Sequence, residues 1–209
     1  MKIPNLHNAG ITRQIIGFCL LGVVIAGLTA CDSNDPERED VPELITKVTL
    51  AFTPSGGGQV VSVTATDPDG EGVQDITVDG AINLMAGTAY TLDILLVNEL
   101  ALEGSPEFDI TSEVAEEADE HLFLFSWSNN VFSSPDGDGN IDNRADPMNY
   151  NDQDDTGLPL GLSTTWTTGS ASSGTFRVLL KHQPEVKSET SDADTGETDL
   201  DVTFTLNVN

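Results

Sequence analysis

The residues best suited to chemistry are the oxygen-bearing side chains of an Asp- and Gly-rich stretch between Ser134 and Asp146. Ca²⁺ takes six to eight oxygen ligands, and glycine allows a short loop to bend around the ion. The same Asp-Gly pairs also form good turns without any ion. The sequence therefore predicts either a plain turn or a calcium loop with the ligands Asp136, Asp138, Asn140, Asp142 and Asp146.

The spacing of three of these aspartates resembles the Asp-x-Asp-Gly-x-x-Asp calcium loops of thrombospondin type 3 repeats. Asp136, Asp138 and Asp142 match that pattern. Ser134 replaces a leading Asp, and Asp146 falls one place beyond the usual closing acid. The resemblance implies bound calcium as a structural cofactor.

Two histidines offer a second, alternative metal site. His121 follows Glu120 where a strand is expected to start, and His182 stands where another strand is expected to end. The ends of strands can converge in a β-sandwich, and imidazole with carboxylate can bind zinc. No ligand spacing such as His-x-x-x-His is present, so histidines at the rim of the core are the competing interpretation.

Catalytic motifs are absent from the sequence. It contains no Gly-x-Ser-x-Gly elbow, no His-Glu-x-x-His and no Gly-rich phosphate loop ahead of a helix. We therefore expect a protein that is not an enzyme. A surface hydrolase stays open as an alternative, because a pair of carboxylates could cleave glycosides. Aromatic residues could bind a sugar, although their alternation in strands favours a core: Tyr90, Trp127, Tyr150 and Trp166.

The N-terminus carries the signal for lipid attachment to Cys31. Lys2 and Arg13 precede an apolar run from 15 to 30, and this run ends in the lipobox Leu-Thr-Ala-Cys at 28–31. This is the pattern of a bacterial lipoprotein signal peptide that is removed before the cysteine. The apolar run is too short for the roughly 20 residues of a membrane-spanning helix. We expect residues 1–30 to be removed and Cys31 to be lipidated.

The mature chain is strongly acidic. Lys2 and Arg13 are the only charged residues among the first 30, so six basic residues face 35 acidic ones, and the formal charge is −29. This charge disfavours nucleic acid as a partner. Residues 31–43 are acidic and predict a flexible tether. Their acidic start resembles the surface-export signal of Bacteroidetes-type lipoproteins, which implies the outer membrane, on its periplasmic or its cell-surface face.

The rest of the chain, residues 44–209, predicts a single all-β domain. Apolar and polar residues alternate in one segment after another, with Gly, Pro and Asp between them. Examples are 48–52, 61–65, 90–96, 176–180 and 200–208. We expect an antiparallel β-sandwich of about eight to ten strands, either Ig-like or jelly-roll-like.

Three segments depart from this simple alternation. Residues 111–120 carry apolar side chains at four-residue spacing and predict one short helix. Residues 122–127 are apolar on both faces and predict a central strand. Residues 152–157 form a second acidic cluster, for which we favour a turn.

Taken whole, the mature chain resembles a family of small Bacteroidetes-type lipoproteins. The resemblance rests on the tether, on 44–58, on the Glu-Glu-Ala-Asp-Glu-His segment at 116–121 and on 169–182. Members of that family are often labelled as having a type 1 periplasmic binding fold. Such a fold needs alternating strands and helices, which this sequence lacks, so we retain the sandwich.

The resemblance implies an accessory protein of the cell envelope, with an outer-membrane nutrient receptor or another envelope protein as partner. We expect a lipid-anchored binding protein whose ligand the sequence does not name. The alternatives are a metal-acquisition lipoprotein for zinc, iron or calcium and a surface hydrolase.

Overall fold

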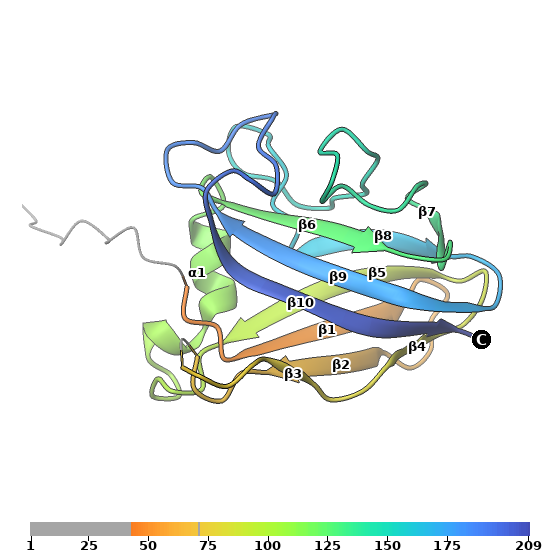
Figure 1. Cartoon of the computed structure of the whole chain (residues 1–209), viewed down its shortest axis with the longest axis horizontal. Coiled ribbons are helices and arrows are strands. Elements are labelled where there is room, and N and C mark those ends of the chain that lie inside the picture. The colour runs from red at the N-terminus through yellow and green to blue at the C-terminus, as the bar shows by residue number, and fades with distance from the viewer. Residues whose placement is uncertain (1–42, 71) are drawn as a thin grey trace, which may run out of the picture. The chain divides into compact units, whose positions relative to one another are not determined.

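The computed structural model describes residues 43–70 and 72–209 of the chain (Figure 1). The predicted signal peptide, the lipidation site at Cys31 and the tether up to residue 42 lie outside the described residues. Within the described ranges, no helix is long and apolar enough to cross a membrane.

The domain consists of ten β-strands, which form one six-stranded and one four-stranded sheet. The first sheet has the order β3-β2-β1-β5-β8-β7, with β1 at Lys47–Pro54, β2 at Val61–Thr66, β3 at Thr77–Val78, β5 at Ala89–Val97, β7 at Phe132–Ser134 and β8 at Ser163–Thr168. The second has the order β4-β10-β9-β6, with β4 at Ile82–Leu84, β6 at His121–Trp127, β9 at Ser172–His182 and β10 at Glu197–Val208. The pairings are antiparallel except that between β10 and β4. This confirms the predicted all-β sandwich.

Alternating side chains of the two sheets build one core. Val48, Leu50 and Phe52 of β1 are fully buried, while the residues between them are at least partly exposed. Aromatic rings fill the centre, where Trp166 and Phe176 meet edge to face with ring centroids 5.1 Å apart. Such burial of large apolar side chains is the main force that holds a sandwich together. Tyr90, Trp127 and Trp166 all belong to this core.

One short α-helix, α1 (Ile110–Glu116), lies at the end of the sandwich where β6 begins (Figure 1). A short 3₁₀ helix, η1 (Pro106–Phe108), precedes it. The side chain of Asp109 caps α1 by accepting a hydrogen bond from the Ser112 amide at 3.2 Å. The helix ends earlier than the predicted residue 120, because the chain must turn at 117–120 to start β6 at His121.

The sequence of β6 predicts a central strand. The structure shows that this prediction is wrong, because β6 stands at the edge of its sheet. Both its faces are nevertheless buried. Phe123 and Phe125 point into the main core, whereas Leu122 and Leu124 pack on the other side in a small second cluster with Leu179, which the loop residues Ile141, Tyr150 and Ala193 cover. Loops therefore cover β6 as a further strand would. Because of this cover, the sequence of β6 has the composition of an interior strand.

Candidate functional sites

His121 and His182 meet at the α1 end of the sandwich. His121 is the first residue of β6 and pairs across the sheet with His182, the last residue of β9. Their rings stack in parallel, with centroids 4.7 Å apart and an interplanar angle of 6°. His121 is fully buried and His182 is 5% exposed. The two strand ends therefore converge, as the sequence predicted.

Four carboxylates surround this pair, and we call the six residues the His/carboxylate cluster: Glu43, Glu117, Glu120, His121, His182 and Asp199. One donor atom each from Glu117, His121 and His182 lies within 4.8 Å of the others. The Glu120 carboxylate lies 3.4 Å from His182 Nε2. Imidazole nitrogens and carboxylate oxygens are together a donor set for divalent transition metals such as zinc.

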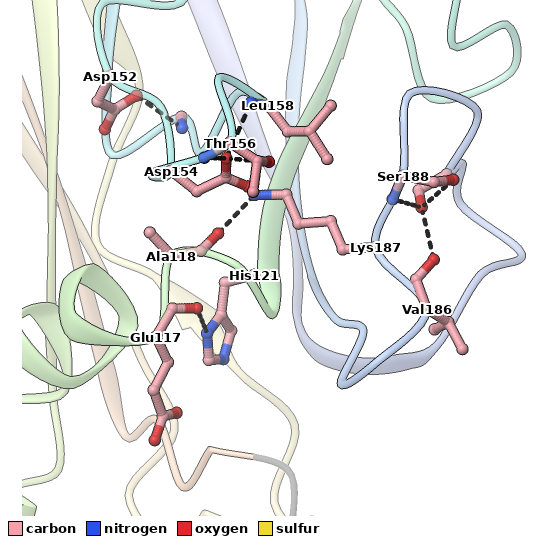
Figure 2. A network of polar contacts seen from close by, with 12 residues as sticks. Glu117, Ala118, His121, Asp152, Asp154, Thr156, Leu158, Val186, Lys187 and Ser188 are labelled. Carbon is pink, nitrogen blue, oxygen red and sulfur yellow. Dashed lines mark hydrogen bonds and ion pairs between the residues drawn. The ribbon is translucent and has the colours of Figure 1, made fainter.

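The ring of His121 is oriented from both sides. Its Nδ1 lies 3.1 Å from the main-chain oxygen of Glu117 (Figure 2), and since a carbonyl only accepts, Nδ1 is the donor. Its Nε2 lies 3.7 Å from both Glu43 Oε1 and Asp199 Oδ2. A hydrogen bond from one ring nitrogen to a carbonyl is the usual way in which proteins orient a metal-binding histidine.

Asp199 reaches the cluster because of an irregularity in β10. The register between β10 and β9 shifts between Thr198 and Leu200, and such a bulge redirects the intervening side chain. The carboxylate of Asp199 is fully buried, and its Oδ1 accepts a hydrogen bond from the Glu43 amide at 3.3 Å. Burial raises the pKa of Asp199 to about 6.

Sequence reasoning found His121, His182 and Glu120 but missed the other three carboxylates. Glu117 stands four residues before His121, a spacing that could have pointed to it. Glu43 and Asp199 are 156 residues apart and belong to the two ends of the domain. No local pattern could have joined them to the histidines.

The Asp-rich loop between β7 and β8 forms a second cluster of acids. Carboxylate oxygens of Asp138, Asp142 and Asp146 lie within 4.8 Å of one another. Of the five predicted ligands, these three come together. The Asn140 side chain instead points inward, where its Oδ1 accepts from the Phe125 amide at 3.0 Å and its Nδ2 donates to Tyr150 Oη at 2.9 Å. Asp136 is not a member of this cluster.

Main-chain bonds fix this loop to the free edge of β6. The Trp127 amide donates to Asp138 O, and the Asn140 amide donates to Phe125 O, both at 2.8 Å. Gly139, with a φ of 112°, passes so close that a Cβ there would lie 2.1 Å from Phe125 O. Tyr150 adds a hydrogen bond to Phe123 O at 2.6 Å, and burial raises its pKa to about 12.

A buried ion pair joins the loops above the His/carboxylate cluster (Figure 2). Lys187 Nζ lies 3.1 Å from Asp154 Oδ2, and both side chains are 2% exposed. Lys187 also donates to the main-chain oxygen of Ala118, in the turn that leads to His121. Asp154 Oδ1 accepts from Thr156 and Leu158, so residues 152–157 do form the predicted turn.

These contacts set the charge of the pair. Burial alone would raise the pKa of Asp154, but the hydrogen bonds from Thr156, Leu158 and Lys187 outweigh it and lower the pKa from 3.8 to about 2. Burial lowers the pKa of Lys187 from its ordinary value, although Asp154 opposes this shift. The pair thus holds three segments of chain together: the turn after α1, the loop before β8 and the loop after β9.

Comparisons with protein-family models, with curated proteins and with solved structures found no match for this chain.

The first prediction concerns the buried ion pair. Lys187→Met leaves the Asp154 carboxylate buried without its cation, so urea unfolding should show a loss of about 3–5 kcal/mol. Asp154→Asn combined with Lys187→Met should recover part of that loss. The matched control is Lys47→Met, since the Lys47–Glu99 pair is largely exposed and contributes at most about 1 kcal/mol. Equal losses in Lys187→Met and Lys47→Met would show that the buried pair has no special weight.

The second prediction is the pH dependence of the same pair. A carboxyl group whose folded-state pKa is depressed stabilises the fold fully above its unfolded-state pKa, and that stability is lost as the pH falls through the folded-state value. For Asp154 the window runs from about pH 4 down to about 2. The stability difference between the wild type and Asp154→Asn should therefore narrow between pH 5 and pH 2 in urea titrations. A constant difference over this range would contradict the assignment.

The third prediction tests calcium in the Asp-rich loop. Millimolar CaCl₂ should raise the melting temperature of the EDTA-treated full chain, by about 2–4 °C for each kcal/mol of binding energy. Asp142→Asn should remove the effect because it deletes one of the three converging carboxylates. Asp155→Asn, an exposed acid of the neighbouring turn, should keep it. Identical melts in EDTA and in calcium would leave the loop as a plain turn.

Proposed function

We propose that this protein is a lipid-anchored binding protein of the bacterial cell envelope whose ligand is a divalent transition-metal cation, held in the His/carboxylate cluster. The observation that carries the proposal is the cross-strand pair His121 and His182, with a Glu117 carboxylate oxygen within 4.8 Å of a nitrogen of each ring. This makes the metal-binding alternative the preferred one among the functions that the sequence leaves open.

The types of donor atom favour a transition metal over calcium or magnesium. Calcium and magnesium take oxygen ligands, whereas imidazole suits zinc, iron, nickel and copper. Among the described residues, the cluster provides two imidazoles and several carboxylates. Zinc is therefore the probe of choice.

The balance of charge in the cluster supports the same conclusion. Its six members are four carboxylates and two imidazoles, and the positive charges that act on its most buried carboxylate, Asp199, are His182 and Lys181. Burying carboxylates is costly unless positive charge compensates them. A divalent cation would provide that charge, and the mature chain's formal charge of −29 would raise the local concentration of cations.

The lipid anchor and the partner in this proposal rest on the sequence alone. The lipobox that ends at Cys31 supports attachment of a lipid, the acidic run after it supports the outer membrane, and the family resemblance supports an outer-membrane nutrient receptor as partner. In this proposal the protein binds the cation at the envelope for that receptor and carries out no reaction on it.

The fourth prediction tests cation binding. The full chain, purified in detergent and cleared of metal with a chelator, should bind one equivalent of zinc in native mass spectrometry and calorimetry. His182→Gln removes one imidazole at the rim and should weaken zinc binding by more than about 100-fold, since even loss of an outer-shell partner costs 10–100-fold.

Asp142→Asn, in the separate Asp-rich loop, is the matched control and should bind zinc as the wild type does. Circular dichroism should give the same β-rich spectrum for all three proteins. Absence of stoichiometric zinc, or equal affinity of the wild type and His182→Gln, would refute the proposal.

A further inference from the structure

Glu43 contacts the cluster through both its main chain and its side chain. Its amide donates to Asp199 Oδ1 at 3.3 Å, and its Oε1 lies 3.7 Å from His121 Nε2. The Glu43 side chain is 11% exposed, although the residue precedes β1 and belongs to no strand. A charged side chain at the start of a domain is normally solvated, whereas this one lies against the buried imidazole of His121.

Two carboxylates approach His121 Nε2, although they lie outside the group of ligand atoms from Glu117, His121 and His182 that are all within 4.8 Å of one another, so a shared ion would require them to move inward. Asp199 Oδ2 and Glu43 Oε1 each lie 3.7 Å from that nitrogen. Two ligands of a tetrahedral zinc ion, each about 2.1 Å from the metal, are about 3.4 Å apart. Asp199 Oδ2 is buried and accepts no hydrogen bond from the described residues. It is thus a buried acceptor directed at the ring nitrogen of a histidine.

We propose that Glu43 is a ligand of the bound cation, so that cation binding fastens the N-terminal segment 43–46 to β6 and β10. This inference rests on the proposed function and adds a consequence to it. Residues 43–46 connect the predicted lipid tether to β1, so the loaded site would fix the point at which the tether joins the domain.

Other contacts show how the segment is held without a cation. The Thr46 amide donates to Val97 O at 3.0 Å, and Ile45 is 6% exposed in the core. The Glu43 amide donates to Asp199. The segment is therefore attached to the domain at Glu43, Ile45 and Thr46, and a cation would add a ligand bond at Glu43.

The fifth prediction follows the segment and the cation in the same sample. Hydrogen exchange of the full chain in detergent should slow by about tenfold at the amides of Leu44, Ile45 and Thr46 when zinc is saturating. Glu43→Gln should bind zinc about 10–100-fold more weakly, within the range known for perturbed metal sites. At saturating zinc it should lack the slowed exchange. Cobalt in place of zinc should give a different visible absorption spectrum in Glu43→Gln than in the wild type.

Glu103→Gln, an exposed glutamate outside the cluster, is the matched control and should leave affinity, exchange and the cobalt spectrum unchanged. If wild type and Glu43→Gln bind zinc equally tightly and exchange is insensitive to zinc, Glu43 is not a ligand, although the proposed function survives. If the wild type binds no zinc, the proposed function fails, and this inference fails with it.

Discussion

The antiparallel register of β6 against β9 decides where the candidate site lies. Inward-facing pairs such as Phe123 with Leu180 and Phe125 with Val178 are buried in the core, and the next inward pair along the two strands is His121 with His182. A slip of one residue would turn all these side chains to the opposite face. The apolar core therefore holds the two imidazoles together, and the site depends on packing that takes no part in its chemistry.

The Asp154–Lys187 ion pair and the His/carboxylate cluster both lie at this end of the sandwich. They differ in the balance between positive and negative side chains. Asp154 and Lys187 neutralise each other, and Thr156, Leu158 and Ala118 complete their hydrogen bonds. Such a pair connects loops, as Figure 2 shows, and needs no ligand. The His/carboxylate cluster instead combines four acids with two imidazoles, and the pKa of its most buried acid, Asp199, is raised to about 6. Buried groups with shifted pKa values often cluster at functional sites.

The class of the fold could be predicted from the sequence, because alternation with a period of two survives in β1, β2, β5, β9 and β10. The place of β6 could not, since its outward residues Leu122 and Leu124 are covered by loops from distant parts of the chain. The helix was predicted to end four residues too late because its apolar spacing continues into the turn at Ala118. Local periodicity thus identifies elements but not what covers them.

The candidate site could be predicted only in part, for the same reason. His121 and Glu120 are neighbours in sequence, and His182 is recognisable at the end of an alternating strand. Glu43 and Asp199 come from the first and last parts of the domain, and Asp199 turns inward only because of a bulge. In the Asp-rich loop, the spacing shows the acids but not that Asn140 is used to fix the loop to β6. Contacts of this kind exist only after the fold has formed.

The central claim is that two imidazoles and neighbouring carboxylates bind one divalent cation. X-ray absorption spectroscopy at the zinc edge, on the full chain loaded with one equivalent of zinc, tests it most directly. We expect four or five ligands at about 2.0–2.2 Å, with the outer-shell scattering of two imidazole rings. A spectrum with oxygen ligands only and no imidazole scattering would place the ion elsewhere and contradict the proposal that the two imidazoles bind it.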